Sequence, residues 1–297
     1  MLALKRTFAV QIPLLIAFAY APCSASAQPI VGADLASFTI LGASTVTNVP
    51  ASTIVGNVGV WSSGGANAVT GFDSSPGVAV SDPQVTGGLV YAGTAVAQSA
   101  QGQLATAISN LGSLGAGTTL TNPDLAGLTL APGVYTVAAG TTNLSGTLTL
   151  DGKGNANGAW VFQMPSTLIT SSNSLVNVIN TGSGAGVYWD VGSSATIGSN
   201  STFLGNILAH TSITMNNTAT DRCGRALANT GAVTLAMNTL SSTCTGILSG
   251  SGGLGGGLSG GVAAPEINAA SAASGLTLLF GGLAVLRGRR VLRVNRG

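Results

Sequence analysis

One pattern occurs three times between residues 194 and 235: Ser194-Ala195-Thr196-Ile197, Ser212-Ile213-Thr214-Met215 and Ala232-Val233-Thr234-Leu235. Each copy contains a small residue, an apolar residue, threonine and a second apolar residue. Successive side chains of a β-strand point to opposite faces, so the apolar residues would share one side and the threonines the other. The threonines are 18 and 20 residues apart, which is too long for a hairpin. This period predicts one turn of a β-solenoid per copy, in which no repeat buries its apolar side alone.

The segments between the copies predict two further strands in each turn. An apolar strand precedes each copy, at residues 187–191, 205–209 and 224–228. A polar, Thr-rich piece follows each copy, at residues 200–203, 217–220 and 238–240. An earlier and less regular copy at residues 160–179 extends the stack by one turn. Three strands per turn predict a coil of triangular cross-section.

The composition favours an ordered β-protein that does not bind nucleic acid. Only 6% of the residues are charged and 44 are glycine, whereas disordered chains are charged and poor in apolar residues. Most of the basic residues lie at the two ends of the chain. Residues 28–263 carry three basic and seven acidic side chains, a formal charge of −4. A nucleic-acid partner needs a basic patch or stripe, and this part of the sequence offers none.

Residues 1–27 have the features of a secretory signal peptide. Lys5 and Arg6 precede an apolar run over residues 8–21, and Ala25-Ser26-Ala27 forms an A-x-A cleavage site before Gln28. Removal of this peptide places the remainder outside the cytoplasm, where a disulfide can persist.

Residues 89–111 predict a helix of about six turns among the strands. Apolar residues recur there in steps of three and four, and Gly112 ends the pattern. The polar side of this helix lacks the Lys and Arg of a membrane-surface helix. We therefore expect the helix to cover one flank of the solenoid.

Six ordered motifs carry a resemblance to a known family. They are Phe38-Thr-Ile-Leu-Gly-Ala-Ser-Thr-Val-Thr-Asn, Leu128-Thr-Leu-Ala-Pro-Gly-Val-Tyr, Ala159-Trp-Val-Phe-Gln, Val187-Tyr-Trp-Asp-Val-Gly-Ser-Ser-Ala-Thr-Ile-Gly, Phe203-Leu-Gly-Asn-Ile-Leu-Ala and Gly224-Arg-Ala-Leu-Ala-Asn-Thr-Gly-Ala-Val-Thr-Leu. The sequence resembles the secreted ice-binding (antifreeze) proteins of bacteria, fungi and diatoms over residues 33–244. The resemblance implies an all-β fold with one long helix, a discontinuous right-handed β-solenoid over residues 28–245. It also implies that the N-terminal coil stacks beside C-terminal coils and that one flat face binds ice.

The threonine side of the repeated strands provides the candidate ice-binding face. Threonine suits such a face because its side chain is stiff at χ1, so that little entropy is lost on binding. The simpler alternative is that threonine is merely a good solvent-facing strand residue. Gly198, Asn216, Ala232 and Ala236 interrupt the rows. The ice-face candidates are Ser194, Thr196, Ser212, Thr214 and Thr234, with Thr45, Thr47 and Thr170 as extensions.

Chemical sites of other kinds have little support in the sequence. His210 is the single histidine, and the seven aspartates of residues 28–263 show no repeated spacing, so the sequence predicts neither an enzyme nor a cofactor or metal site.

Cys223 and Cys244 lie 21 residues apart, close to one coil, which predicts a disulfide between adjacent layers. Two free buried thiols are the alternative.

The C-terminal part of the sequence forms separate modules. Residues 246–263 read as a flexible Gly/Ser-rich linker. Residues 264–297 contain Ala264-Pro265-Glu266-Ile267, an uncharged run and an Arg cluster, an order that resembles the PEP-CTERM sorting signals of Gram-negative bacteria. A simple C-terminal membrane anchor is the alternative.

Two functions follow from these observations. The first is ice binding by a secreted or cell-surface protein, whose contact with a membrane is limited to its tail before processing. The second is an extracellular matrix or adhesion module that binds polysaccharide. Regular outward Thr rows in the folded chain would favour the first, and exposed aromatic platforms the second.

Overall fold

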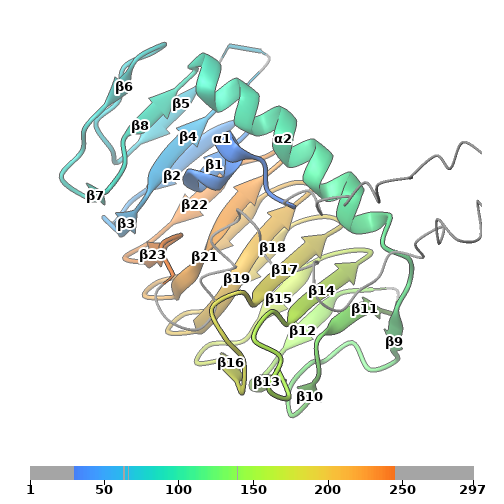
Figure 1. The fold of residues 1–297 in the computed structure, drawn as a ribbon. Coiled ribbons are helices and arrows are strands. Elements are labelled where there is room, and N and C mark those ends of the chain that lie inside the picture. The colour runs from blue at the N-terminus through green and yellow to red at the C-terminus, as the bar shows by residue number, and fades with distance from the viewer. Residues whose placement is uncertain (1–29, 63, 66, 139, 245–297) are drawn as a thin grey trace, which may run out of the picture.

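The fold is a β-solenoid with one long helix along its side, as the computed structural model of the chain shows (Figure 1). The structure describes residues 30–62, 64–65, 67–138 and 140–244. The predicted signal peptide, the linker and the sorting tail lie outside these residues. Each full turn of the coil contributes three strands, one to each of three faces, which we name A, B and C. The prediction of an all-β solenoid with one long helix is therefore confirmed.

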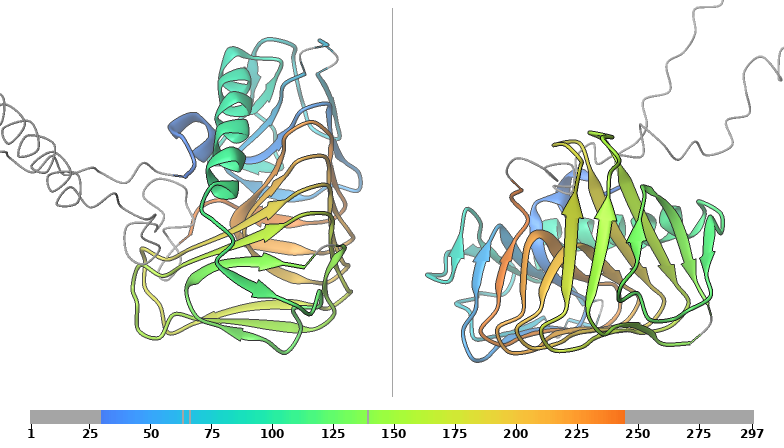
Figure 2. Two further views of the ribbon diagram at one scale, coloured as in Figure 1. Left: turned by 90° about the vertical axis from the view of Figure 1, so that its right-hand side faces the viewer. Right: turned by 90° about the horizontal axis from the view of Figure 1, so that it is seen from below.

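Face A is the side that the helix covers (Figure 2, left). Its strands lie in the order β6 (Ala79–Val80), β8 (Val90–Ala92), β4 (Asn57–Val60), β1 (Phe38–Gly42), β21 (Thr220–Ala228), β19 (Thr202–Ala209), β17 (Gly186–Val191), β14 (Ala159–Met164), β11 (Gly133–Val137) and β9 (Thr118–Leu120). All neighbouring pairs are parallel except β6 with β8.

Face B is a separate seven-stranded parallel sheet on the open side of the molecule, opposite the helix (Figure 2, left). Its strands lie in the order β12 (Thr142–Leu144), β15 (Leu168–Thr170), β18 (Ala195–Ile197), β20 (Ile213–Met215), β22 (Val233–Leu235), β2 (Thr45–Asn48) and β5 (Ala68–Thr70).

Face C completes the triangle and shares two strands with face A. It contains β10 (Thr129–Leu130), β13 (Thr147–Asp151), β16 (Leu175–Ile179), the first residues of β19 and β21, β23 (Thr239–Ser241), β3 (Thr53–Val55) and β7 (Val85–Thr86). Because β19 and β21 continue around the corner, faces A and C form one hydrogen-bonded sheet.

The stack does not follow the order of the chain. Strands β1, β2 and β3 of the N-terminal coil pair with β21, β22 and β23 of the C-terminal coil, one pair on each face. This arrangement confirms that the N-terminal coil stacks beside C-terminal coils. The chain then crosses to the far end of the stack through the helix α2 (Ala95–Gly112).

Helix α2 begins six residues later than the sequence pattern predicts. Residues 90–92 form strand β8, which lies between β6 and β4 and in which Val90 pairs with Val58, and Gly93 follows with a φ of 65°. The Thr94 hydroxyl then caps the helix by accepting a hydrogen bond of 3.2 Å from the Ala97 N–H. Eighteen residues make the helix about 27 Å long, about five turns rather than six. The prediction of a helix from residue 89 was wrong because an apolar run next to a glycine fits either a strand or a helix.

The apolar side of α2 packs on face A, as predicted. Its buried residues are Ala97, Ala100, Leu104, Ala107, Ile108 and Leu111, which contact the buried outer residues of β1, β14, β17 and β21. Val96, in contrast, lies on the solvent side with 41% of its surface exposed. A short helix, α1 (Ala33–Ala36), packs beside α2.

Arg225 is a structural residue at the junction of α1 and face A. It is almost fully buried, and its two terminal nitrogens donate to the Asn206 Oδ1 atom at 2.9 Å and to the Ala36 carbonyl at 2.6 Å. Burial lowers the pKa of this guanidinium to about 10, below its ordinary value. Arg225, one of the three basic residues between residues 28 and 263, therefore holds the N-terminal segment against face A.

A ladder of aromatic rings fills the interior at one end of the coil. Tyr135, Phe162, Trp189 and Phe203 follow one another with ring centroids 5.6, 4.3 and 4.9 Å apart. The Trp189 indole donates a hydrogen bond of 2.9 Å to the Leu204 carbonyl, so its buried N–H is satisfied. All four rings belong to the core cluster that also contains buried residues from the strands of faces B and C.

Candidate functional site

The outward side of face B carries an unbroken run of threonines in adjacent strands. Thr196, Thr214, Thr234, Thr47 and Thr70 pair in direct register across β18, β20, β22, β2 and β5. Adjacent strands lie about 4.8 Å apart, so the run is about 19 Å long. Asn143 and Ile169 continue the same row at the other end of the sheet. We call these seven residues the Thr row.

A second outward row lies two residues earlier on each strand, about 6.7 Å from the first. It consists of Thr141, Thr167, Ser194, Ser212, Ala232, Thr45 and Ala68, which we call the Ser/Thr row. Neighbouring coils are joined along it. The Thr167 hydroxyl donates to the Thr141 hydroxyl at 3.0 Å, and the Ser212 hydroxyl accepts from the Ala232 N–H at 3.1 Å. The first bond joins two side chains of the row, and the second joins the row to the backbone of the next coil.

The opposite side of these strands is buried, as the alternation predicts. Ala195, Ile197, Ile213, Met215, Val233 and Leu235 each expose 1% of their surface or less. Because the packed interior holds every second residue, the outward side chains stand in a fixed lattice. The seven strands of face B contain no charged residue.

Seven of the eight predicted face residues lie together in these two rows. Ser194, Ser212 and Thr45 belong to the Ser/Thr row, and Thr47, Thr196, Thr214 and Thr234 to the Thr row.

Thr170, the eighth predicted residue, points into the protein instead. Its side chain is buried, and its hydroxyl accepts a hydrogen bond of 2.8 Å from the Gly198 N–H. Buried Leu168 pairs with Ala195 and sets the register, so that Ile169 is the outward residue of this coil. The prediction was wrong because it matched this coil by residue type, whereas the two-residue period decides which side a residue takes.

Three outward threonines of face B are not among the eight residues that the sequence predicts. Thr70 ends Ala68-Val69-Thr70, which repeats the small-apolar-Thr pattern, so its signal was present in the sequence. Thr141 and Thr167 have no such pattern of their own, and only the pairing of β12 with β15 places them beside each other.

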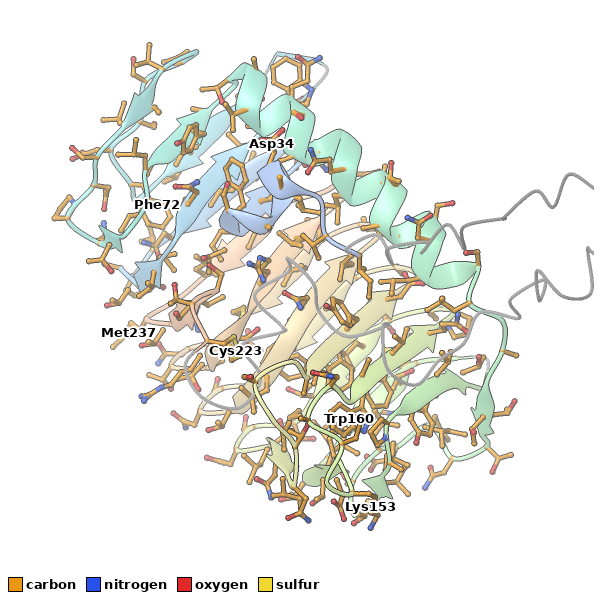
Figure 3. The ribbon with its side chains drawn as sticks, in the orientation of Figure 1. Asp34, Phe72, Lys153, Trp160, Cys223 and Met237 are labelled. Atoms are coloured by element: carbon orange, nitrogen blue, oxygen red, sulfur yellow. A yellow bond between two sulfur atoms is a disulfide. The ribbon has the colours of Figure 1, made fainter. Side chains whose placement is uncertain are left out.

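Cys223 and Cys244 form the disulfide that their spacing predicts. The Cys223 and Cys244 sulfurs are bonded, with Cα atoms 5.0 Å apart, and Cys223 lies at the turn from face C to face A (Figure 3). The bond ties the chain just after β23 to β21, and thus closes the C-terminal coil onto its neighbour.

A shallow hollow on face A, at the end of α2, is lined by an aspartate and a histidine. Asp190 and His210 line it together with Gln163, whose amide donates to the Leu111 carbonyl at 2.7 Å. Burial raises the pKa of Asp190 to about 6, and the nearby His210 opposes this rise. Among the described residues, no three His, Cys, Asp or Glu side chains are grouped to hold a metal ion. In the same part of the chain, no helix is long and apolar enough to span a membrane.

Comparisons of the sequence and of the structure with known proteins indicate the same family. The family model described as "Ice-binding-like" matches residues 40–241. An ice-binding protein of Nostoc sp. is 42% identical over 245 residues, which are 82% of this chain and 86% of that protein. An ice-binding protein of Antarctomyces psychrotrophicus superposes with a TM-score of 0.63 at 32% identity, over 72% of this chain and 98% of that one. A domain of ice-binding protein 1 from Shewanella frigidimarina gives a TM-score of 0.64 at 28% identity, over 72% and 97% of the two chains.

Proposed function

Since this chain belongs to the Ice-binding-like family, we propose that it adsorbs to ice crystals through face B and so inhibits ice growth and recrystallisation. The observation that carries the choice of face is the register of the Thr row, in which five threonines occupy adjacent strands. Face A is covered by α2, whereas face B is open along its whole length (Figure 2, left).

The chemistry of the two rows suits an ordered layer of water. Each threonine presents one methyl and one hydroxyl, and its restricted χ1 keeps both groups in place at little entropic cost. The rows repeat at about 4.8 Å along the stack and about 6.7 Å along each strand. A lattice of this kind holds water at regular positions, whereas a charged side chain would keep its own mobile hydration shell.

We also propose where the protein works. A signal peptide over residues 1–27 would export the chain, and the bond between Cys223 and Cys244 is compatible with an oxidising compartment. The PEP-CTERM-like tail would then sort the protein to the surface of a Gram-negative cell. Ice is the partner in this proposal, and neither a cofactor nor catalysis is part of it.

The test is ice recrystallisation inhibition and crystal shaping by the purified protein and two variants. Thr214→Tyr places a bulky ring in the middle of the Thr row. Thr106→Tyr makes the same substitution at an exposed position of α2, on face A, and is the matched control. Both changes are at the surface, so we expect unfolding free energies within about 0.5 kcal/mol of the parent.

We expect the parent and the Thr106→Tyr variant to shape ice crystals and the Thr214→Tyr variant to lose most of this activity. Equal activity of the parent and the Thr214→Tyr variant would show that face B is not the contact surface. A folded parent that leaves ice growth unchanged would refute the proposed function. Polysaccharide binding would then be examined next, although Trp160 and Trp189 are fully buried and Trp61 is the one tryptophan that is partly exposed.

A further inference from the structure

A second line of threonines runs along face C, in the row nearest to face B. Thr202, Thr220, Thr239 and Thr53 pair in direct register across β19, β21, β23 and β3. Thr202 and Thr53 are exposed, and the other two are partly exposed. We call these four residues the corner Thr row. Their strand neighbours Phe203, Asp221, Leu240 and Ile54 are buried, so the threonines are the outward residues of this line.

Strand propensity alone does not account for this row. The next outward row of face C is mixed: its centre contains Asn177, Leu204, Arg222, Ser241 and Val55, and threonine occurs only towards its two ends, at Thr129, Thr149 and Thr86. Threonine would serve equally well at the five central positions if only a good strand former were required. Four threonines in succession occur instead in the one row that borders face B.

A regular corner joins the two faces. Asn200, Thr218 and Met237 occupy equivalent positions in successive coils, each with a φ between 52° and 61°. The N–H groups of these three residues donate to the Asn217, Ala236 and Pro50 carbonyls of the next coil, at 3.1 Å each. Met237 lies at the edge of the molecule, half exposed (Figure 3). The same kind of turn thus occurs in three of the four coils that carry the corner Thr row, and in the fourth the chain turns through Val49 and Pro50 instead. The corner Thr row follows the Thr row of face B from coil to coil.

We propose that the corner Thr row is a second ice-contacting surface, set at an angle to face B. The inference rests on the proposed function, since it assigns the same ligand to a second face. The row has the same repeat of about 4.8 Å along the stack as face B. Arg222 lies one outward position further on, and its hydrated charge limits the contact to this single row. Face B is therefore the main surface, and the corner row adds a contact with crystal planes of another orientation.

The test is the pattern that fluorescently labelled protein leaves on a single-crystal ice hemisphere. Thr220→Tyr removes the centre of the corner row, and Thr202→Tyr is a second variant at an exposed position of the same row. Thr214→Tyr blocks face B, and Thr106→Tyr on α2 is the control. Urea unfolding of each variant establishes that it is folded.

We expect the parent to label two sets of planes and the Thr220→Tyr and Thr202→Tyr variants to lose one of them. The Thr214→Tyr variant should lose the other set and keep the weaker one. Corner-row variants with the same pattern as the parent would overturn the inference while leaving face B as the ice-contacting surface. A parent that labels no plane would refute the proposed function itself, and the second surface with it.

Discussion

Replacing Asp190 by Asn should make the protein more stable near neutral pH and leave its stability unchanged at pH 4. The carboxyl lies under the last turn of α2, 8% exposed, with one oxygen lacking a hydrogen-bond partner. Burial raises its pKa, and the carbonyl end of the helix acts in the same direction, whereas His210 opposes the shift. The fold therefore favours the neutral acid.

The sign and size of the effect follow from proton linkage. Between an unfolded pKa of 3.8 and a folded pKa of about 6, the folded state binds more protons, so stability falls as pH rises through this window. One pK unit corresponds to about 1.4 kcal/mol, which sets an upper bound of about 3 kcal/mol. Water at the open side of the hollow screens the charge, so we expect about 1 to 2 kcal/mol.

Urea unfolding of the parent and of Asp190→Asn at half-unit steps from pH 4 to pH 7 measures this difference. Asp221 is fully buried and its pKa is also raised by burial. Because Asp221 is present in both proteins, its contribution cancels in the difference between their unfolding free energies. Asp73→Asn, at an exposed position, corrects for the loss of one negative charge. The reasoning fails if the two stability curves stay parallel over this range.

Two other substitutions test the interior and the face. Phe162→Ala opens a cavity between Tyr135 and Trp189, and should lower the free energy of urea unfolding by about 4 kcal/mol; a loss below about 1.5 kcal/mol would show that the ladder collapses into the space. Ile169→Thr lengthens the threonine run from five strands to six. It should inhibit recrystallisation at a lower concentration than the parent, and weaker inhibition would contradict the role of the Thr row.

The sequence was most informative where one coil repeats another. The copies at Thr196, Thr214 and Thr234 have the same length, the same residue pattern and the same burial. Aligning their sequences therefore also gives the register in which their strands pair. Prediction failed at Thr170, where only the apolar-Thr pair Ile169-Thr170 resembles the copies and the pairing of buried Leu168 with Ala195 shifts the register by one position. A one-residue slip exchanges the inner and outer sides of a strand, and composition cannot reveal it.

The corner Thr row could not be predicted from the sequence in the same way. Thr53 lies beside Thr239, and this contact exists only because the N-terminal coil stacks on the C-terminal one. No local pattern specifies a pairing between segments that are so far apart in the chain. The family resemblance implied that the two coils meet, but it did not give the register between them.

The same discontinuity couples the candidate ice face to completion of the fold. Thr47 and Thr70 come from N-terminal strands, yet they extend the row that ends with Thr234 of the C-terminal coil. Until these coils meet, the row has only the three threonines of β18, β20 and β22. Adsorption to a regular surface depends on many weak contacts made at once, so its strength rises steeply with their number. A chain that has not closed its two ends together would thus present a shorter lattice, and the long-range pairing that completes the core also completes the surface proposed to bind ice.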